Sequence, residues 1–503
     1  MRKTLLIQIY HYNFRLGSNL IPTQFRWNIL LNVILWVLLP LPIWLPLLHP
    51  HIPIMWSITF LFSIQAMFTI CWLAVAFMSL ITYFKIFLSR HQIAAEDKYT
   101  HLVCMATYKE PIELVVATIE SLANQTVVGN TILAIGFEER TPDKDVKEDR
   151  IRHLFGSKFK KIITTAHPYG IEGEIPGKCS NNNFALRESE KILRGEGYDT
   201  DNILVTTCDA DNKFHPNYLE TLGEKFSSTP DPHTALYQAP LLYNWGLDEA
   251  SVVTRVTGIV RASLMMGVLI PFNINTMSVF SFSGKLMKQG KFVHPGYQMD
   301  DIICLIRFMG ITRERLRIIC VPVFNLSGPT SGRVIEDEIV EWARQARRWT
   351  IGAGEVFHYF MIKSSGIPCL TGMSWGTCFL FYYCILLCGS SLYSFILGVS
   401  TLLLPFPTSL PVSPYLSLIS LSFLLLTYLT YAIFFFIDWK APLLLEPKPV
   451  EKVCFLRNFY HFLLSPLVLL AYSLVELYAL HELLFLGKEV CKHGASKKQT
   501  LGV

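Results

Sequence analysis

Three short clusters of polar residues in this chain have types and spacing suited to chemistry, and the first is Asp209-Ala210-Asp211. It follows an apolar run, 203–206, that we expect to form a strand. Residues i and i+2 of an extended chain point to the same side, so the two carboxylates would repel each other without a cation between them. Mg²⁺ or Mn²⁺ suits such oxygen ligands, particularly when it also binds substrate phosphates. The alternative is a solvated acidic turn, because a lone Asp-x-Asp is common.

The second cluster is Asp300-Asp301, which comes immediately before an apolar helix expected over 302–309. Negative side chains are favoured at the N-terminus of a helix, so an acidic first turn is one interpretation. The other is that Asp301 is a general base, which removes the proton from an acceptor hydroxyl.

The third cluster is Gln345-Ala346-Arg347-Arg348-Trp349. On a helix, Gln345, Arg348 and Trp349 share one face because they are spaced i, i+3 and i+4. A guanidinium on that face can bind a diphosphate, and an indole offers a flat apolar surface to a sugar ring. The same helix has an apolar stripe, which predicts that it also lies along the membrane surface; the stripe consists of Ile335, Ile339, Trp342 and Ala346.

The elements that must position these clusters alternate between strand-like and helix-like runs. Strands are expected at 102–105, 131–135, 162–164 and 203–206, and helices at 112–123 and 182–193. Such alternation predicts an α/β domain with a mostly parallel sheet. Ligands of such domains bind beyond the carboxyl ends of the strands, which is where Asp209 falls.

The rest of the chain is apolar. Of its 503 residues 51% are hydrophobic and 17% are charged, against roughly 25% charged in an average soluble domain. This composition excludes intrinsic disorder and a nucleic-acid-binding tail. The nearly uncharged blocks are 27–48, 53–83, 370–405, 413–437 and 459–486. Each is long enough to cross a bilayer. By contrast, Arg255 and Arg261 interrupt segment 252–270, which predicts an amphipathic helix of the α/β domain.

Lysine and arginine indicate the topology, because they are enriched on the cytoplasmic side. Basic residues before the first block and after the second, such as Arg26 and Lys85, place the N-terminus and region 90–363 in the cytoplasm. Five spans would leave the basic C-terminal tail outside, against the rule. Either Pro466 breaks the last block, or block 370–405 forms two short spans that bend near Gly389, which would give six.

In chain order the motifs are Ala106-Thr107-Tyr108-Lys109-Glu110, Gly177-Lys178, Asp209-Ala210-Asp211, Phe282-Ser283-Gly284, Asp300-Asp301 and Gln345-Ala346-Arg347-Arg348-Trp349. Taken together they resemble the membrane-embedded, inverting family 2 glycosyltransferases, such as cellulose, chitin and hyaluronan synthases. The resemblance implies a GT-A fold, a Rossmann-like α/β domain for a nucleotide-sugar, inserted in an α-helical multi-span membrane protein. The regions it implies are an N-terminal membrane region of two spans (1–90), the catalytic domain (91–334), interfacial helices (335–365), a C-terminal membrane region of three or four spans (366–487) and a basic tail (488–503).

The resemblance also implies a role for each motif residue. Thr107, Tyr108, Glu110, Lys178 and Asp209 would bind the nucleotide-sugar, Asp209 and Asp211 the metal, and Phe282, Ser283, Gly284 and Trp349 the acceptor, while Asp300, Asp301, Gln345, Arg348 and Trp349 would be catalytic. The family usually has an Asp after its second strand, whereas this chain has Glu138 and Glu139, either of which could replace it in reading the base.

The implied activity is transfer of a sugar from a nucleotide-sugar, with Mg²⁺ or Mn²⁺, to build a β-linked polysaccharide at the cytoplasmic face, with or without export. The nearest alternative is transfer of one sugar to a lipid. A third class, a transporter or receptor with a nucleotide-sensing domain, would not need a general base. The expected partners are the donor, a glycan or lipid acceptor and the bilayer, without nucleic acid; an oligomer is compatible with the sequence.

Overall fold

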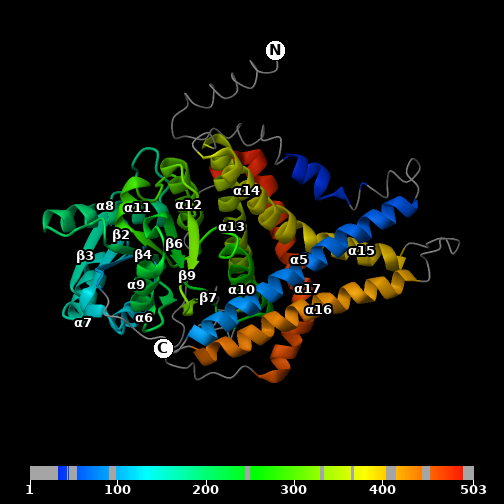
Figure 1. The fold of residues 1–503 in the computed structure, drawn as a ribbon, viewed down its shortest axis with the longest axis horizontal. Coiled ribbons are helices and arrows are strands. Elements are labelled where there is room, and N and C mark those ends of the chain that lie inside the picture. The colour runs from blue at the N-terminus through cyan, green and yellow to red at the C-terminus, as the bar shows by residue number, and fades with distance from the viewer. Residues whose placement is uncertain are drawn as a thin grey trace, which may run out of the picture.

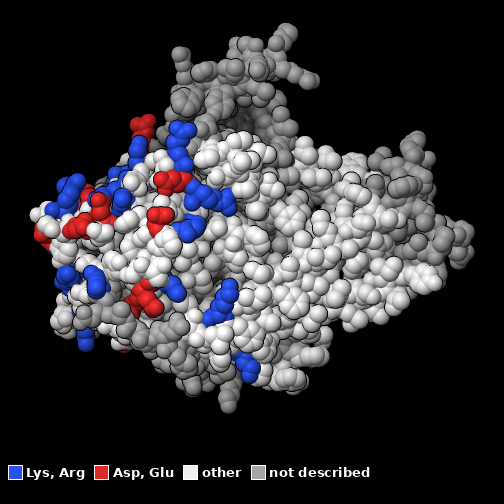
Figure 2. All heavy atoms as spheres, in the orientation of Figure 1, with Lys and Arg blue, Asp and Glu red and all other residues white. Residues whose placement is uncertain are grey.

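The computed structural model describes residues 32–41, 44, 54–89, 98–243, 250–328, 334–363, 367–403, 415–444 and 454–490. An α/β domain and a set of long helices lie side by side (Figure 1). Figure 2 shows lysine, arginine and acidic side chains gathered over the α/β domain, while the visible face of the long helices is almost uncharged. The basic N-terminal residues and the end of the basic tail lie outside the described residues, as does half of block 27–48, so the topology predicted from them stays a prediction.

The α/β domain is built on a seven-stranded sheet of order β3-β2-β1-β4-β8-β6-β9. Its strands are β1 (His101–Thr107), β2 (Thr131–Glu138), β3 (Lys161–His167), β4 (Leu204–Cys208), β6 (Ala235–Gln238), β8 (Phe280–Ser283) and β9 (Arg317–Cys320). The first four strands of that order run parallel, β8 is antiparallel to both neighbours, and β9 is parallel to β6. Six of the seven strands therefore run in the same direction and only β8 is reversed, so the sheet is mixed but mostly parallel, as the sequence predicts.

A second, three-stranded sheet of order β5-β10-β7 lies next to the end of β4. It consists of β5 (Asn212–Lys213), β7 (Leu241–Leu242) and β10 (Asn325–Ser327). The N–H of Gly328, just after β10, donates to the carbonyl of Asp211 at 2.8 Å. This small sheet brings Ser327 and Gly328 beside the Asp209–Asp211 cluster.

The helices of this domain are α6 (Ile112–Ala123), α7 (Lys144–Phe155), α8 (Lys178–Gly195), α9 (Tyr218–Ser228), α11 (Gly284–Gln289) and α12 (Asp300–Thr312), with 3₁₀ turns at Val128–Asn130 and Pro232–Thr234. Helix α6 has the bounds that the sequence predicts. Helix α8 begins earlier than predicted, at Lys178, which therefore stands in its first turn. Helix α12 begins at Asp300, so both acidic residues are in its first turn, as the sequence indicates.

The described residues contain five helices that are long and apolar enough to cross a membrane: Thr59–Ser89, Val252–Leu269, Cys369–Val399, Leu418–Lys440 and Phe455–Leu486. They belong to α5 (Ile54–Ser89), α10 (Val252–Leu264) with its π-helical end (Met265–Leu269), α14 (Cys369–Leu380) with the π-helical segment Phe381–Gly389 and α15 (Ser390–Leu403), α16 (Leu416–Lys440) and α17 (Phe455–Leu486). Helix continues through Pro466, so this residue does not break the last block. Helix also continues through Gly389, at the end of the π-helical segment, and a bend there stays a prediction.

Two helices join the α/β domain to the long apolar helices. Helix α10 was expected in the α/β domain. Of its apolar stretch Val252–Leu269, 83% is buried inside the protein, and Arg255 pairs with Asp438 of α16 at 3.2 Å. Helix α13 (Ile335–Lys363) packs on both α12 and α17. Of its predicted apolar stripe, Trp342 and Ala346 are buried, whereas Ile335 and Ile339 are exposed. The third cluster is thereby held between the sheet and the helices.

Candidate active site

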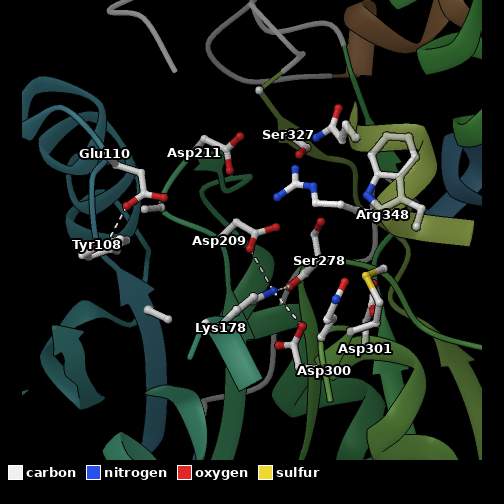
Figure 3. A pocket seen from close by; sticks show the side chains of 18 of the residues that line it. Tyr108, Glu110, Lys178, Asp209, Asp211, Ser278, Asp300, Asp301, Ser327 and Arg348 are labelled. Carbon is white, nitrogen blue, oxygen red and sulfur yellow. Dashed lines mark hydrogen bonds and ion pairs between the residues drawn. The ribbon is translucent and has the colours of Figure 1, made fainter. Parts of the chain in front are cut away.

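A cavity lies at the carboxyl edge of the parallel strands, between the sheet and α13 (Figure 3). This is the edge at which open α/β sheets bind ligands. The predicted site residues on its lining are Thr107, Tyr108, Glu110, Glu138, Lys178, Asp209, Asp211, Asp300, Asp301, Gln345, Arg348 and Trp349. They come from strand ends and helix starts that are far apart in the sequence, and the fold brings them together.

Lys178 is the cation at the centre of the cavity. Its Nζ lies 2.9 Å from Asp209 Oδ1 and 3.1 Å from Asp300 Oδ1, and both ion pairs are drawn in Figure 3. A lysine in the first turn opposes the helix dipole, so these carboxylates are what makes the position favourable. Burial alone would lower the pKa of Lys178, but Asp209 and Asp300 raise it well above its usual value. The ammonium therefore stays charged and can bind an anion such as a diphosphate.

The adjacent residues Asp300 and Asp301 are in different environments. Asp300 pairs with Lys178 and accepts a hydrogen bond from Asn182 Nδ2 at 3.0 Å. No ion pair to Asp301 occurs among the described residues. Burial, and then the charge of Asp300, raise the pKa of Asp301 to about 7. A base works best when its pKa is near the working pH, so Asp301 has the properties of a general base.

Asp209 and Asp211 follow the end of β4, where the sequence places them. The N–H of Asp209 donates to Asn212 Oδ1 at 2.7 Å, and the Asp211 side chain is almost fully buried next to Gly328. No group of three or more His, Cys, Asp or Glu side chains that could hold a metal occurs among the described residues. Asp209 and Asp211 supply two carboxylates, so a Mg²⁺ or Mn²⁺ ion held by them would take its other ligands from substrate phosphates and water.

Tyr108 and Glu110, in the loop after β1, lie on the opposite side of the cavity from Arg348 (Figure 3). Glu110 accepts hydrogen bonds from Thr107 Oγ1 at 3.1 Å and from the N–H of Tyr108 at 2.7 Å, which fixes the loop after β1. Glu138 pairs with Arg140 at 3.2 Å, and the Arg140 guanidinium also lies over the Tyr108 ring. Glu138 is thus near the predicted base-binding loop but already has a cationic partner.

Helix α13 supplies Gln345, Arg348 and Trp349 to the cavity from one face, as their spacing predicts. Burial lowers the pKa of Arg348 from its usual value. Trp349 stacks with Arg261 of α10, whose Cζ is 3.3 Å from the ring centroid. Arg261 is not among the predicted site residues, because an arginine that interrupts an apolar run is typical of the polar face of an amphipathic helix.

The predicted acceptor residues Phe282, Ser283 and Gly284 do not line this cavity. Strand β8 runs antiparallel to β4, which places Ser283 opposite Leu204 at the start of β4, away from Asp209. All three are buried, and Ser283 caps α11 by accepting from the N–H of Leu286 at 3.2 Å. Ser278, two residues before the start of β8, lines the cavity instead. The residues that the sequence missed also include Tyr243, Arg261, Gln298 and Ser327.

No protein-family model matches this sequence, and no curated protein matches it. Solved structures give low-scoring similarities. A mannosyltransferase of Pyrobaculum calidifontis, in complex with GDP-Man and Mn²⁺, is 14% identical with a TM-score of 0.43, over 75% of this chain and 98% of its own. Glucosyl-3-phosphoglycerate synthase of Mycobacterium tuberculosis, with Mn²⁺, UDP and phosphoglyceric acid, is 15% identical with a TM-score of 0.29, over 54% and 80%. TarS 1–349 of S. aureus is 12% identical with a TM-score of 0.31, over 76% and 90%. Identities and scores this low assign no role to any residue of this chain.

Proposed function

We propose that this protein is a metal-dependent, inverting glycosyltransferase with a GT-A catalytic domain, which uses a nucleotide-sugar, most simply a UDP-sugar, at the cytoplasmic membrane face. One observation carries the proposal: two cationic side chains, an acidic pair fit for a divalent cation and a carboxyl fit for general-base chemistry line the same cavity. These are Lys178, Arg348, Asp209, Asp211 and Asp301. A domain that only senses a nucleotide does not need a general base such as Asp301.

The donor fits between the strand ends and α13. Lys178 and Arg348 bind the diphosphate, and the loop of Thr107, Tyr108 and Glu110 holds the base. Asp209 and Asp211 would hold Mg²⁺ or Mn²⁺, which when bound neutralises charge on the diphosphate leaving group. Preorganised charges that face the developing negative charge are worth several kcal/mol in a site that excludes water.

Asp301 takes the proton from the acceptor hydroxyl, and the oxygen attacks the anomeric carbon on the side opposite to the diphosphate. One displacement inverts the anomeric centre, so an α-linked donor gives a β-linked product. Asp300 does not compete as the base because it holds Lys178 at 3.1 Å. Its role is to position that lysine against the donor.

The acceptor is either a growing glycan, which the resemblance favours, or a lipid. A second, smaller cavity shares Asp301 and Trp349 with the first and extends among α10, α17 and the π-helical segment Phe381–Gly389. Its side chains are largely aliphatic and aromatic, including Leu264, Leu387 and Leu469. A hydrated glycan needs polar groups along its path, so this lining favours the lipid acceptor as a second candidate function.

The experiment is an assay of purified protein in lipid nanodiscs with radiolabelled nucleotide-sugars and either Mg²⁺ or Mn²⁺. We expect metal-dependent incorporation that EDTA abolishes, and the size of the product separates a polymer from a single glycolipid. The matched control is Asp211→Asn, which keeps the size of the side chain and removes its charge. Nucleotide binding without any transfer, across the panel of sugars, would instead favour a sensing domain and refute the proposal.

A further inference from the structure

Arg261 lies where the active-site cavity and the second cavity meet, because it lines both. Its guanidinium is held by rings: Cζ is 3.3 Å from the centroid of Trp349 and 5.2 Å from that of Tyr243. Among the described residues no carboxylate pairs with it and no group accepts its hydrogen bonds. Arg255, two turns earlier on the same helix, instead pairs with Asp438.

A half-buried guanidinium without an anionic partner is costly, because desolvation of a charge is offset only by pairing or hydrogen bonding. Stacking on aromatic rings fixes the plane of the guanidinium and leaves its N–H edges available. Those edges match the geometry of a phosphate or carboxylate, which they bind through two parallel hydrogen bonds. The arrangement at Arg261 is that of an anion-binding site.

The position of Arg261 indicates which substrate carries the anion. The donor diphosphate already has Lys178, Arg348 and the metal-binding pair. Arg261 shares the second cavity with Asp301, the proposed base for the acceptor. The anion that it binds is therefore part of the acceptor.

Beyond Arg261 the surroundings become apolar. Val260, Leu264 and Leu269 line the second cavity, and Leu469 lines both this cavity and a third one of about 600 Å³. The third cavity lies among α5, α15, α16 and α17. Helices α5, α16 and α17 each contain one whole candidate membrane span, and α15 contains the end of another. The apolar lining of the second cavity is thus joined through Leu469 to that of the third cavity, among the long helices.

We propose that the acceptor is an anionic lipid with a free hydroxyl, whose charged group binds Arg261 and whose hydrocarbon chain enters the second cavity. This rests on the proposed function. The lipid hydroxyl forms the bond to the anomeric carbon, the bond from that carbon to the diphosphate breaks with its electron pair, and the proton passes to Asp301. A lipid phosphate oxygen is not the nucleophile, because an oxygen that is already ionised has no proton for Asp301 to remove.

The test compares phosphatidylglycerol with diacylglycerol of the same acyl chains, since both carry a free hydroxyl and only the first is anionic. Each lipid is titrated into nanodiscs of neutral phosphatidylcholine that contain the full chain and its donor. We expect a kcat/KM for phosphatidylglycerol at least about tenfold above that for diacylglycerol, as a charged hydrogen bond predicts. Arg261→Gln should remove that preference by raising KM for phosphatidylglycerol to the level of diacylglycerol, while Arg261→Lys should restore part of it.

The control for total charge is Arg150→Gln, because Arg150 is a surface residue on α7 that pairs with Glu113. Nucleotide affinity and slow donor hydrolysis without a lipid acceptor are measured in every variant. Equal use of both lipids, with normal donor hydrolysis, would overturn this inference and leave the proposed function standing. Loss of nucleotide affinity in Arg261→Gln would overturn it by assigning the anion to the donor. Absence of donor turnover in the wild-type protein under all conditions would overturn both.

Discussion

The ammonium of Lys178 lies 3.1 Å from the carboxylate of Asp300, whereas the next residue, Asp301, has no such ion pair among the described residues. Asp301 is therefore the better candidate for a base. Because Asp300 forms an ion pair with Lys178, the two neighbouring carboxyls have different roles. Asp300 positions the lysine for the donor, and Asp301 is available to the acceptor. The charge of Asp300 also contributes to the raised pKa of Asp301. The pair thus sets both the position of the lysine and the basicity of the aspartate.

We expect Asp301→Asn to lower kcat by about 10²- to 10⁴-fold, the range that general-base catalysis contributes. Nucleotide affinity should not change, because the donor contacts of Lys178 and Arg348 remain. Radiolabel transfer gives kcat, and calorimetry gives the affinity. Asp300→Asn is the matched comparison: it should weaken nucleotide binding by releasing Lys178 and reduce kcat less. The reverse pattern would assign the base to Asp300.

The activity should fall at acid pH with an apparent pKa of about 7, because Asp301 must be ionised to accept a proton and its pKa is raised to about 7. Below that pH each unit should cost about tenfold in kcat/KM. In Asp300→Asn the midpoint should move to lower pH, because the charge of Asp300 is one of the causes of the raised pKa. A midpoint that is the same in both proteins would mean that another group controls the profile.

Local sequence patterns were enough to predict the parallel half of the sheet and the residues at its edge. Every residue of β2 is buried and its interior is apolar, which makes the strand recognisable in the sequence, and helix α6 has the predicted bounds. Parallel strands end at one edge, which is why Asp209 could be placed at a ligand-binding position. The shared face of Gln345, Arg348 and Trp349 followed from helical spacing alone.

Features that depend on pairing between distant segments could not be predicted. Strand β8 has an ordinary apolar sequence, and only its antiparallel pairing with β4 places Ser283 away from the cavity and Ser278 at it. The contact of Arg261 with Trp349 joins α10 to α13, and nothing in either helix alone indicates it. Likewise, the apolar character of 252–270 does not reveal that α10 is mostly enclosed by protein.

Asp301→Asn should also make the protein more stable at neutral pH. The pKa of Asp301 is raised to about 7 in the folded protein, against about 3.9 in an unfolded chain. Between those values the folded state binds a proton that the unfolded state releases, so the stability from this group decreases as pH rises from about 4 to 7. The variant should therefore melt at a higher temperature at pH 8, and the difference should vanish near pH 4. Asp145→Asn, at an exposed position, is the control and should show no such trend.

Lys178→Met should destabilise the protein, because it leaves the buried carboxylate of Asp300 without its cation. Removing one partner of a buried ion pair costs about 3 kcal/mol or more. Adding Asp300→Asn to this variant should recover part of the loss, since the uncompensated charge is then gone. Denaturant or thermal unfolding of the two single variants and the double variant gives the coupling energy. Additive effects would show that the 3.1 Å contact contributes little to stability.

Gly328→Ala should weaken metal binding although it replaces no candidate ligand. A Cβ on Gly328 would lie 3.0 Å from Asp211 Oδ2 and 3.2 Å from Asp211 Cβ, so the carboxylate must move by a few tenths of an ångström. Small displacements of catalytic groups are costly, and we expect the Mn²⁺ concentration for half-maximal transfer to rise by about threefold to tenfold. Asp211→Asn should abolish the response to metal, whereas Gly129→Ala, where the new Cβ meets nothing within 4 Å, should match the wild-type protein. Unchanged Mn²⁺ dependence in both Asp211→Asn and Gly328→Ala would rule out Asp211 as a metal ligand, and the cation would then have to be held by Asp209 and the donor alone.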